Sequence, residues 1–209
     1  ASLAGCLGRA QWTVPIASDN CPGLSVNSNF NSGDTFAIGQ HTVTYTATDA
    51  AGNTAVCSFN IVVADNVPPV ITGCPGNITR FASDTSCQAI VSWIVPVATD
   101  ACEPVSLSGN FTPGTTFGQG THVVHYTATD AHGNTAQCAF NVIVIDNIPP
   151  VISNCPQDIT LTLDTSSCEV VAEWTSPDFA DNCGILDVVS NFDSGSTFGY
   201  GVHTITYAA

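Results

Sequence analysis

The sequence predicts an all-β fold made of tandem immunoglobulin-like β-sandwiches, and three observations support this prediction. Val, Ile, Thr, Phe and Tyr carry much of the apolar content, which is typical of strands. The 209 residues include 17 Gly and 12 Pro but no Met, so short runs are separated by many turns. The third observation is a repeat, because ATDAAGNTAVCSF at residues 47–59 returns as ATDAHGNTAQCAF at residues 128–140.

The repeat has a period of 81 residues, and every cysteine obeys it: Cys6, for example, recurs as Cys87 and Cys168. Aromatic and histidine positions follow the same period: Trp12, Trp93 and Trp174; Phe36, Phe117 and Phe198; His41, His122 and His203; Tyr45, Tyr126 and Tyr207. We therefore expect three modules: residues 1–65 without a first strand, a complete repeat at 66–146, and residues 147–209 without a last strand. This pattern indicates a window on a longer array, with strand exchange between subunits as the alternative.

The complete repeat reads as short strands separated by turn residues. We expect strands A, B, C, a short crossing segment, F and G at residues 69–81, 87–95, 104–111, 114–117, 121–130 and 135–146. Pro75 falls inside the first of these, which indicates an edge strand or a bulge. Apolar residues alternate in the last two strands, at Val124, Tyr126 and Ala128, and at Phe140, Val142 and Val144. About seven strands in some 80 residues are typical of an immunoglobulin-type sandwich.

The segment TDAHGNT at residues 129–135 joins the last two strands, and we call it the F–G hairpin. Asp130 is suited to an Asx-turn, and Gly133 can adopt a positive φ. The repeated motif is therefore first of all predicted to be a turn.

The charge balance limits the partners that the chain can have. Seventeen acidic residues face two basic ones, Arg9 and Arg80, and the formal net charge is −15. Nucleic acid is excluded by this balance, and an anionic membrane surface is disfavoured. No run of 18 apolar residues is present, so we expect no membrane insertion. An acidic surface favours cations, calcium above all; the alternative is that acidity keeps an extracellular protein soluble.

Neither a zinc site nor a catalytic site is expected. The cysteines lack a C-x-x-C pair, so disulfides formed in an oxidising, extracellular setting explain them better than zinc does. Three of the five histidines occupy one repeated strand position, which is typical of a structural residue rather than a catalytic base. We therefore predict no catalytic residue and no enzymatic activity.

Several ordered motifs resemble the HYR (hyalin repeat) domain across the whole chain. They are PPVITGCPGNIT, SWIVPVATDAC, the stretch GTTFGQGTHVVHYTATDAHGNTAQCAFNVIVID and the following NIPP. The resemblance implies extracellular, immunoglobulin-like modules that occur in tandem in secreted and cell-surface proteins and are linked to adhesion. It also implies that the modules are not themselves catalytic.

The resemblance also implies a disulfide scheme. Strands A and G are neighbours in such a sandwich, which favours a Cys74–Cys138 bond. The family's pattern favours Cys87–Cys102, and the repeat then adds Cys6–Cys21 and Cys168–Cys183. Residues 96–102 would have to run back along strand B for the Cys87–Cys102 bond to form. Cys57 and Cys155 are left with partners outside this chain; a rival scheme pairs Cys57–Cys74 and Cys138–Cys155.

Acidic and amide side chains are expected to meet where one module follows another. The B–C and F–G loops of such a sandwich lie at the end that faces the preceding linker, and their oxygens are suited to calcium. The expected ligands are Asp65, Asn66, Asp100 and Asp130 at the first junction, and Asp146, Asn147, Asp181 and Asn182 at the second. The alternative is that each Asp-Asn-Pro linker simply forms a turn. Two sequons, at Asn77 and Asn110, are candidate glycosylation sites.

These observations favour a non-enzymatic extracellular structural or adhesive array, part of a long fibre with regularly spaced rigid modules. Its expected partners are neighbouring copies or repeats of the same protein. The alternative is an accessory module of a secreted or cell-surface protein that binds cell-surface glycans or proteins.

Overall fold

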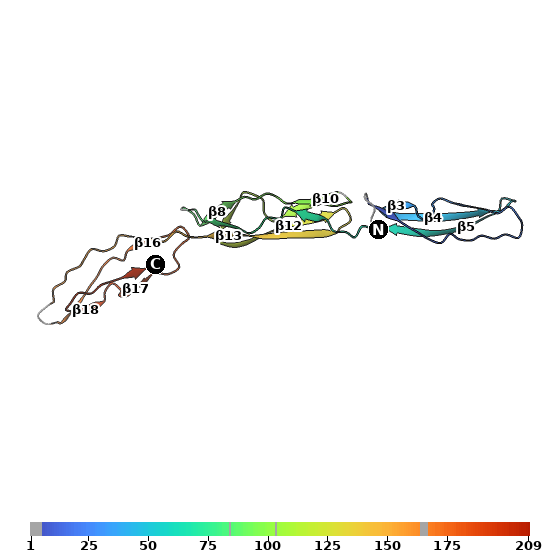
Figure 1. Ribbon diagram of the computed structural model, residues 1–209. Coiled ribbons are helices and arrows are strands. Elements are labelled where there is room, and N and C mark those ends of the chain that lie inside the picture. Colours follow the sequence, from blue (N-terminus) through green and yellow to red (C-terminus); the bar gives the residue numbers. More distant parts are fainter. Residues whose placement is uncertain (1–5, 84, 103, 164–166) are drawn as a thin grey trace. The chain divides into compact units, whose positions relative to one another are not determined.

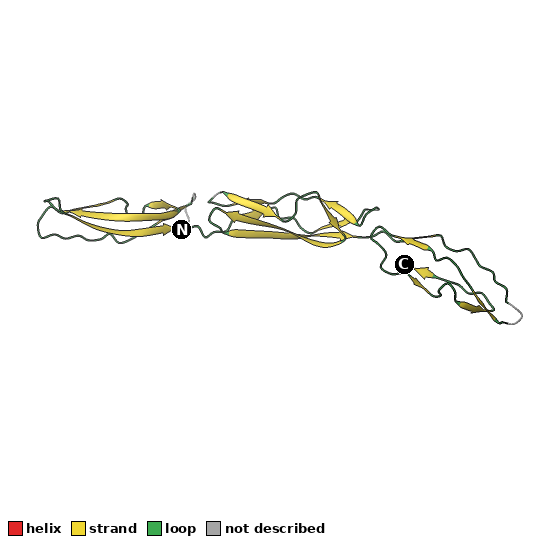
Figure 2. Ribbon diagram, turned by 180° about the vertical axis from the view of Figure 1, so that it is seen from behind, coloured by secondary structure: helices red, strands yellow, loops and turns green. Residues whose placement is uncertain are grey.

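The computed structural model describes residues 6–83, 85–102, 104–163 and 167–209, and the regular elements found there are all strands (Figure 1). The predicted all-β fold is thereby confirmed, as the ribbon coloured by secondary structure also shows (Figure 2). Backbone contacts group the chain into two units. Each unit includes part of the central repeat, and the two are described in turn.

The first unit comprises residues 1–75, 94–110 and 125–139. Its first repeat holds a three-stranded sheet in the order β2-β4-β5 and a small β1-β3 pair, all antiparallel. These strands are β1 (Leu7–Arg9), β2 (Ser25–Ser28), β3 (Thr35–Ala37), β4 (Gly39–Thr48) and β5 (Thr54–Val63). The unit also contains β6 (Val70–Thr72), β9 (Val97–Thr99) and β10 (Val105–Gly109) of the central repeat.

The second unit comprises residues 76–93, 111–124 and 140–209. From the central repeat it takes β7 (Ile78–Phe81), β8 (Gln88–Val91) and β11 (Thr115–Gly118). The strands of the third repeat pair two by two, as β14-β16, β15-β18 and β17-β19. They are β14 (Val151–Ser153), β15 (Glu169–Val171), β16 (Asp178–Ala180), β17 (Val189–Ser190), β18 (Thr197–Gly199) and β19 (Tyr207–Ala208).

Two long strands, β12 (Gly120–Asp130) and β13 (Thr135–Ile145), run through both units and carry the core of the central repeat. They lie in a sheet with the order β10-β12-β13-β7. Successive side chains of a strand point to opposite faces, so alternate residues are buried. The predicted residues are buried: Val124, Tyr126 and Ala128 on β12, and Phe140, Val142 and Val144 on β13; Asp130 and Cys138 are buried on the same strands.

The expected strand at residues 69–81 is in fact two strands. β6 pairs antiparallel with β9, a strand that the sequence did not predict, whereas β7 pairs parallel with β13. Between them Gly73 has a φ of 73°, and Pro75 has no N–H to donate to a ladder. These two residues end the first pairing and allow the chain to change partners.

A cluster of aromatic rings repeats in each module. Phe36, Phe117 and Phe198 are buried, and each has its ring centroid 6.3 Å from that of the tryptophan of the same repeat. Trp12 and Trp174 donate their indole N–H groups to the hydroxyls of Tyr45 and Tyr207, at 2.8 and 2.7 Å. The repeated tryptophans therefore pack against the core, and the polar atoms of Trp12 and Trp174 are satisfied.

The buried ring of Phe117 should be a main support of the central repeat. Phe117 is 2% exposed, so Phe117→Ala removes a whole ring from a packed site and should lower the free energy of unfolding by about 3–5 kcal/mol. Ile90→Ala is the control, because Ile90 is 71% exposed and its loss should cost less than about 0.5 kcal/mol. Denaturant unfolding under non-reducing conditions measures both, and equal costs would contradict this assignment of the core.

Candidate functional site

The F–G hairpin is organised by Asp130, as predicted. Its Oδ1 accepts hydrogen bonds from the backbone N–H groups of His132 and Asn134, both at 2.8 Å, and its Oδ2 accepts one from Nδ2 of Asn134 at 2.7 Å. Gly133 has a φ of 89°, the predicted left-handed conformation. Asp130 is only 6% exposed, and this burial opposes ionisation, but the hydrogen bonds from the hairpin outweigh it and lower the pKa of the carboxyl group.

The disulfides join each repeat to the next. Cys74 bonds to Cys138 within the central repeat, as expected. Cys6 bonds to Cys102, however, and Cys87 bonds to Cys183. Both of these bonds span 96 residues and connect the start of one repeat's strand B to the B–C turn of the following repeat.

The expected Cys6–Cys21, Cys87–Cys102 and Cys168–Cys183 bonds are therefore wrong. Cys87 and Cys102 belong to different contact units, because the chain from β8 to β9 leads from one unit into the other. The sequence does not distinguish the two pairings, because Cys21, Cys102 and Cys183 occupy the same position of the 81-residue repeat. Among the described residues, the free cysteines are Cys21, Cys57, Cys155 and Cys168, all exposed.

At the first junction, three of the predicted carboxylates come together within the first unit. Asp65, Asp130 and His132 each offer one ligand atom within 4.8 Å of the others, and so do Asp65, Asp100 and Cys102. Asp65 belongs to both groups, and its side chain is 6% exposed. Asn66, the fourth predicted ligand, is exposed.

The second junction, within the second unit, repeats part of this arrangement. Asp146 and Asp181 lie within the same 4.8 Å limit together with Cys183. Asp146 accepts a hydrogen bond from the N–H of Ile148, and Asp181 from the N–H of Cys183, as their counterparts do at the first junction. Asn182 is half-buried, whereas Asn147 is exposed.

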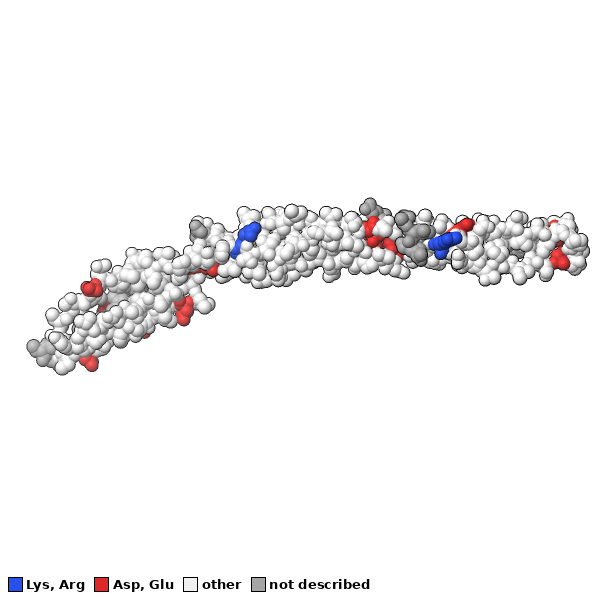
Figure 3. Space-filling view, in the orientation of Figure 1, with Lys and Arg blue, Asp and Glu red and all other residues white. Residues whose placement is uncertain are grey.

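Both arginines are engaged away from these acidic groups. Nε of Arg9 donates to the carbonyl oxygen of Gly33 at 2.9 Å, and NH1 of Arg80 donates to that of Thr79 at 2.9 Å. The space-filling view shows basic side chains at two places on a surface with scattered acidic ones (Figure 3). Neither is placed to neutralise the junction carboxylates.

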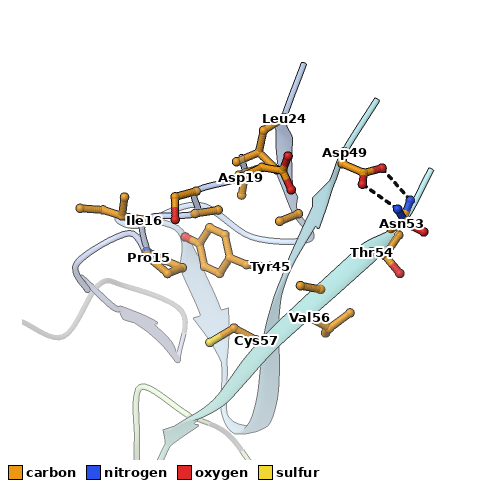
Figure 4. Close-up of a pocket in the computed structure, with 15 residues that line it drawn as sticks. Pro15, Ile16, Asp19, Leu24, Tyr45, Asp49, Asn53, Thr54, Val56 and Cys57 are labelled. Carbon is orange, nitrogen blue, oxygen red and sulfur yellow. Dashed lines mark hydrogen bonds between the residues drawn. The ribbon is translucent and has the colours of Figure 1, made fainter. Parts of the chain in front are cut away.

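A groove of about 390 Å³ lies in the first repeat and is bounded by residues 15–19, by Tyr45 and by Cys57 (Figure 4). Shifted by one repeat, residues 16–18 correspond to β9, which pairs with β6, and Cys57 corresponds to Cys138, which bonds to Cys74. The groove is thus the place that β6 and its cysteine fill in the central repeat. Cys57 is accordingly exposed, whereas Cys138 is buried.

The two sequons occupy different structural positions. Asn77 is exposed, and its Oδ1 accepts a hydrogen bond from the N–H of Asn141. Asn110 accepts one from the N–H of His125, at a position where Asn29 and Asn191 bridge the neighbouring strand with both amide atoms. This position has a structural use in other repeats, and glycosylation of Asn77 and Asn110 stays a prediction.

The repeated histidines act as packing residues. Nε2 of His41, His122 and His203 lies 2.8–3.0 Å from the carbonyl oxygen four residues earlier. Each ring also packs against the buried phenylalanine of its repeat, with centroids 5.0–5.2 Å apart. Their recurrence in the sequence thus reflects a shared structural contact.

Comparison with known proteins gives the relationships of the chain. A family model described as HYR domain matches residues 8–63, 64–144 and 145–209. Hyalin of Strongylocentrotus purpuratus is 37% identical over 207 residues, covering 95% of this chain and 17% of that protein. Hyalin of Lytechinus variegatus is 36% identical over 204 residues, covering 94% of this chain and 38% of that protein. The chain thus spans well under half of the length of these relatives.

More distant similarities extend to other repeat proteins. The mouse protein named Sushi, von Willebrand factor type A, EGF and pentraxin domain-containing protein 1 is 37% identical over 162 residues, which are 75% of this chain and 4% of that protein. The solved structure described as PcdhgB3 EC1-4 is 14% identical, covers 94% of this chain and 62% of that chain, and has a TM-score of 0.31.

The chain is an extracellular or cell-surface repeat, as its relatives and disulfides show. Within the described residues, no helix has the length and apolar character needed to cross a membrane.

The hairpin of the first repeat offers a test of the turn chemistry. Asp49 accepts hydrogen bonds from the side chain and the backbone of Asn53, which lower the pKa of its carboxyl group below the ordinary 3.8. Its stabilising effect should be complete above pH 3.8 and should be lost as the pH falls through the lower, folded-state pKa. Titration of the side-chain carboxyl carbon of Asp49 by NMR, in the folded chain and in the chain unfolded by denaturant, measures this. A folded-state midpoint at or above the unfolded-state midpoint would refute the turn's electrostatic role.

Proposed function

Because this chain belongs to the HYR domain family, we propose that it is a non-enzymatic structural and adhesive segment of a long extracellular fibre. In this fibre, successive modules are held together by the peptide linker and by a disulfide across each junction. The proposed partners are neighbouring repeats or copies of the same protein, together with cell-surface proteins or glycans.

One observation carries the proposal: the same cross-repeat disulfide occurs twice. Cys6–Cys102 and Cys87–Cys183 join equivalent positions, so the bond belongs to the repeat unit and not to one local sequence. Each bond closes a loop of 96 residues, which in the chain-entropy model lowers the free energy of the folded state relative to the unfolded state by roughly 4–5 kcal/mol. A module with such a bond at each junction is suited to a load-bearing array.

The absence of a catalytic role is supported by the structural contacts that the chemically reactive side chains make. Cysteines at the junctions are bonded to one another, and the repeated histidines pack on phenylalanine rings. Asp130, the most buried acid of the central repeat, is occupied by its own hairpin.

The cross-repeat bond can be tested by cutting the linker. A protease site placed at residues 67–69 allows cleavage between the first and second repeats, after which Cys6–Cys102 alone should keep the fragments together. Non-reducing electrophoresis should show one band that separates on addition of a thiol reductant. The same cut in a Cys6→Ser, Cys102→Ser double variant should release the fragments without reductant. Release from the unsubstituted chain would contradict the pairing.

The fibre itself is tested on the native material. Electron microscopy should show filaments with a regular repeat, and the intact mass should be well above 21.6 kDa. Discrete particles of 21.6 kDa would refute the proposed array, whatever the disulfide pairing.

A further inference from the structure

The carboxylate of Asp65 is buried at the first junction, and one of its two oxygens has no hydrogen bond. Its Oδ1 accepts from the N–H of Val67 at 3.1 Å, but its Oδ2 is inaccessible to solvent and has no hydrogen-bond partner. The side chain as a whole is 6% exposed. A buried carboxylate oxygen without a partner is costly, so this position calls for a cationic ligand.

His132 is the one described cationic candidate beside this oxygen, and it is poorly placed to satisfy it. Its Nδ1 lies 3.4 Å from Oδ2 of Asp65, and the ring carries a charge only when protonated. The chain has no lysine, and both arginines donate to carbonyl groups elsewhere.

Two further carboxylates lie within 4.8 Å of Asp65, those of Asp100 and Asp130. Each is held by backbone donors: the N–H of Cys102 donates to Oδ1 of Asp100 at 2.7 Å, and the F–G hairpin holds Asp130. Cys102 cannot be a ligand because its sulfur is bonded to Cys6. The donors that remain are mainly oxygens, which suit a hard cation better than a soft one.

We propose that a calcium ion binds at this junction, coordinated by Asp65, Asp100 and Asp130. Calcium accepts six to eight oxygens, so backbone carbonyl groups and water complete the shell. The ion offsets the mutual repulsion of the three carboxylates and pairs the buried oxygen of Asp65. It also ties the linker to the B–C turn and the F–G hairpin, which the disulfide alone does not do.

The second junction carries a related group of acidic side chains. Asp146 and Asp181 repeat the positions of Asp65 and Asp100. Oδ1 of Asn182 is buried there without a hydrogen-bond partner, while its Nδ2 donates to the carbonyl oxygen of Ser83 at 3.1 Å. That donation fixes the amide orientation, so the unpaired atom is the oxygen. Carboxylate and amide oxygens of this kind also suit calcium.

The test is calcium titration of the whole chain after removal of metal by EDTA. Isothermal calorimetry should show binding in the range of about 0.1–1 mM, as for extracellular calcium modules, and calcium should raise the melting temperature. Asp65→Asn should weaken binding at the first junction about tenfold or more, as expected when a site loses a ligand charge. Asp146→Asn should leave binding at the first junction unchanged.

A second readout separates a lost ligand from a damaged fold. In EDTA, Asp65→Asn removes a buried charge, so it should melt at the same temperature as the unsubstituted chain or higher. In calcium, only the unsubstituted chain should gain the full stabilisation. The matched control is Asp49→Asn, which changes the counterpart of Asp130 in the first repeat and should leave calcium affinity unchanged.

Three results would overturn the proposal. One is the absence of binding heat and of a melting shift at about 10 mM calcium, well above the range for such modules. Another is an Asp65→Asn variant that binds calcium as tightly as the unsubstituted chain. The last is preferential binding of zinc that His132→Ala abolishes, which would assign the site to a transition metal.

Discussion

The disulfide between Cys6 and Cys102 is the interaction on which the first junction depends. It anchors the B–C turn of the central repeat, and the N–H of Cys102 in turn holds the carboxylate of Asp100. The carboxylate of Asp65, in the linker, lies within 4.8 Å of the carboxylates of Asp100 and of Asp130 in the F–G hairpin. In addition, Nδ2 of Asn134 donates a hydrogen bond to the carbonyl oxygen of Asp65. Three segments far apart in the sequence thus share one small region, which is held together by this disulfide and by these hydrogen bonds.

Local physics made much of the fold predictable. The alternation of Val124, Tyr126 and Ala128 identifies a strand with one buried face, and Asp130 with Gly133 specifies the hairpin that follows. Both features depend only on neighbouring residues. Cys74 and Cys138 were predictable from the kind of sandwich, because strands A and G are neighbours in it.

The cross-repeat disulfides could not be predicted because the repeat makes the alternatives equivalent. A cysteine at the position of Cys102 recurs in every module, so the sequence does not say which module supplies the partner of Cys87. A signal was present, however: a Cys87–Cys102 bond required residues 96–102 to turn back along strand B. In the structure Val97–Thr99 of this segment form β9, which lies in the other unit, and this is the physical reason that the bond crosses the junction.

The two cross-repeat disulfides also determine how the chain would carry tension. The loop from Cys6 to Cys102 overlaps the loop from Cys87 to Cys183, so a pulling force enters through one sulfur bridge and leaves through the other. Between the bridges the shortest covalent route runs backwards along the segment from Cys102 to Cys87. Unfolding of the rest of the central repeat would therefore not increase the distance that the stretched chain can span. The contour length of the strained chain is set by bonds that break by chemistry rather than by unfolding.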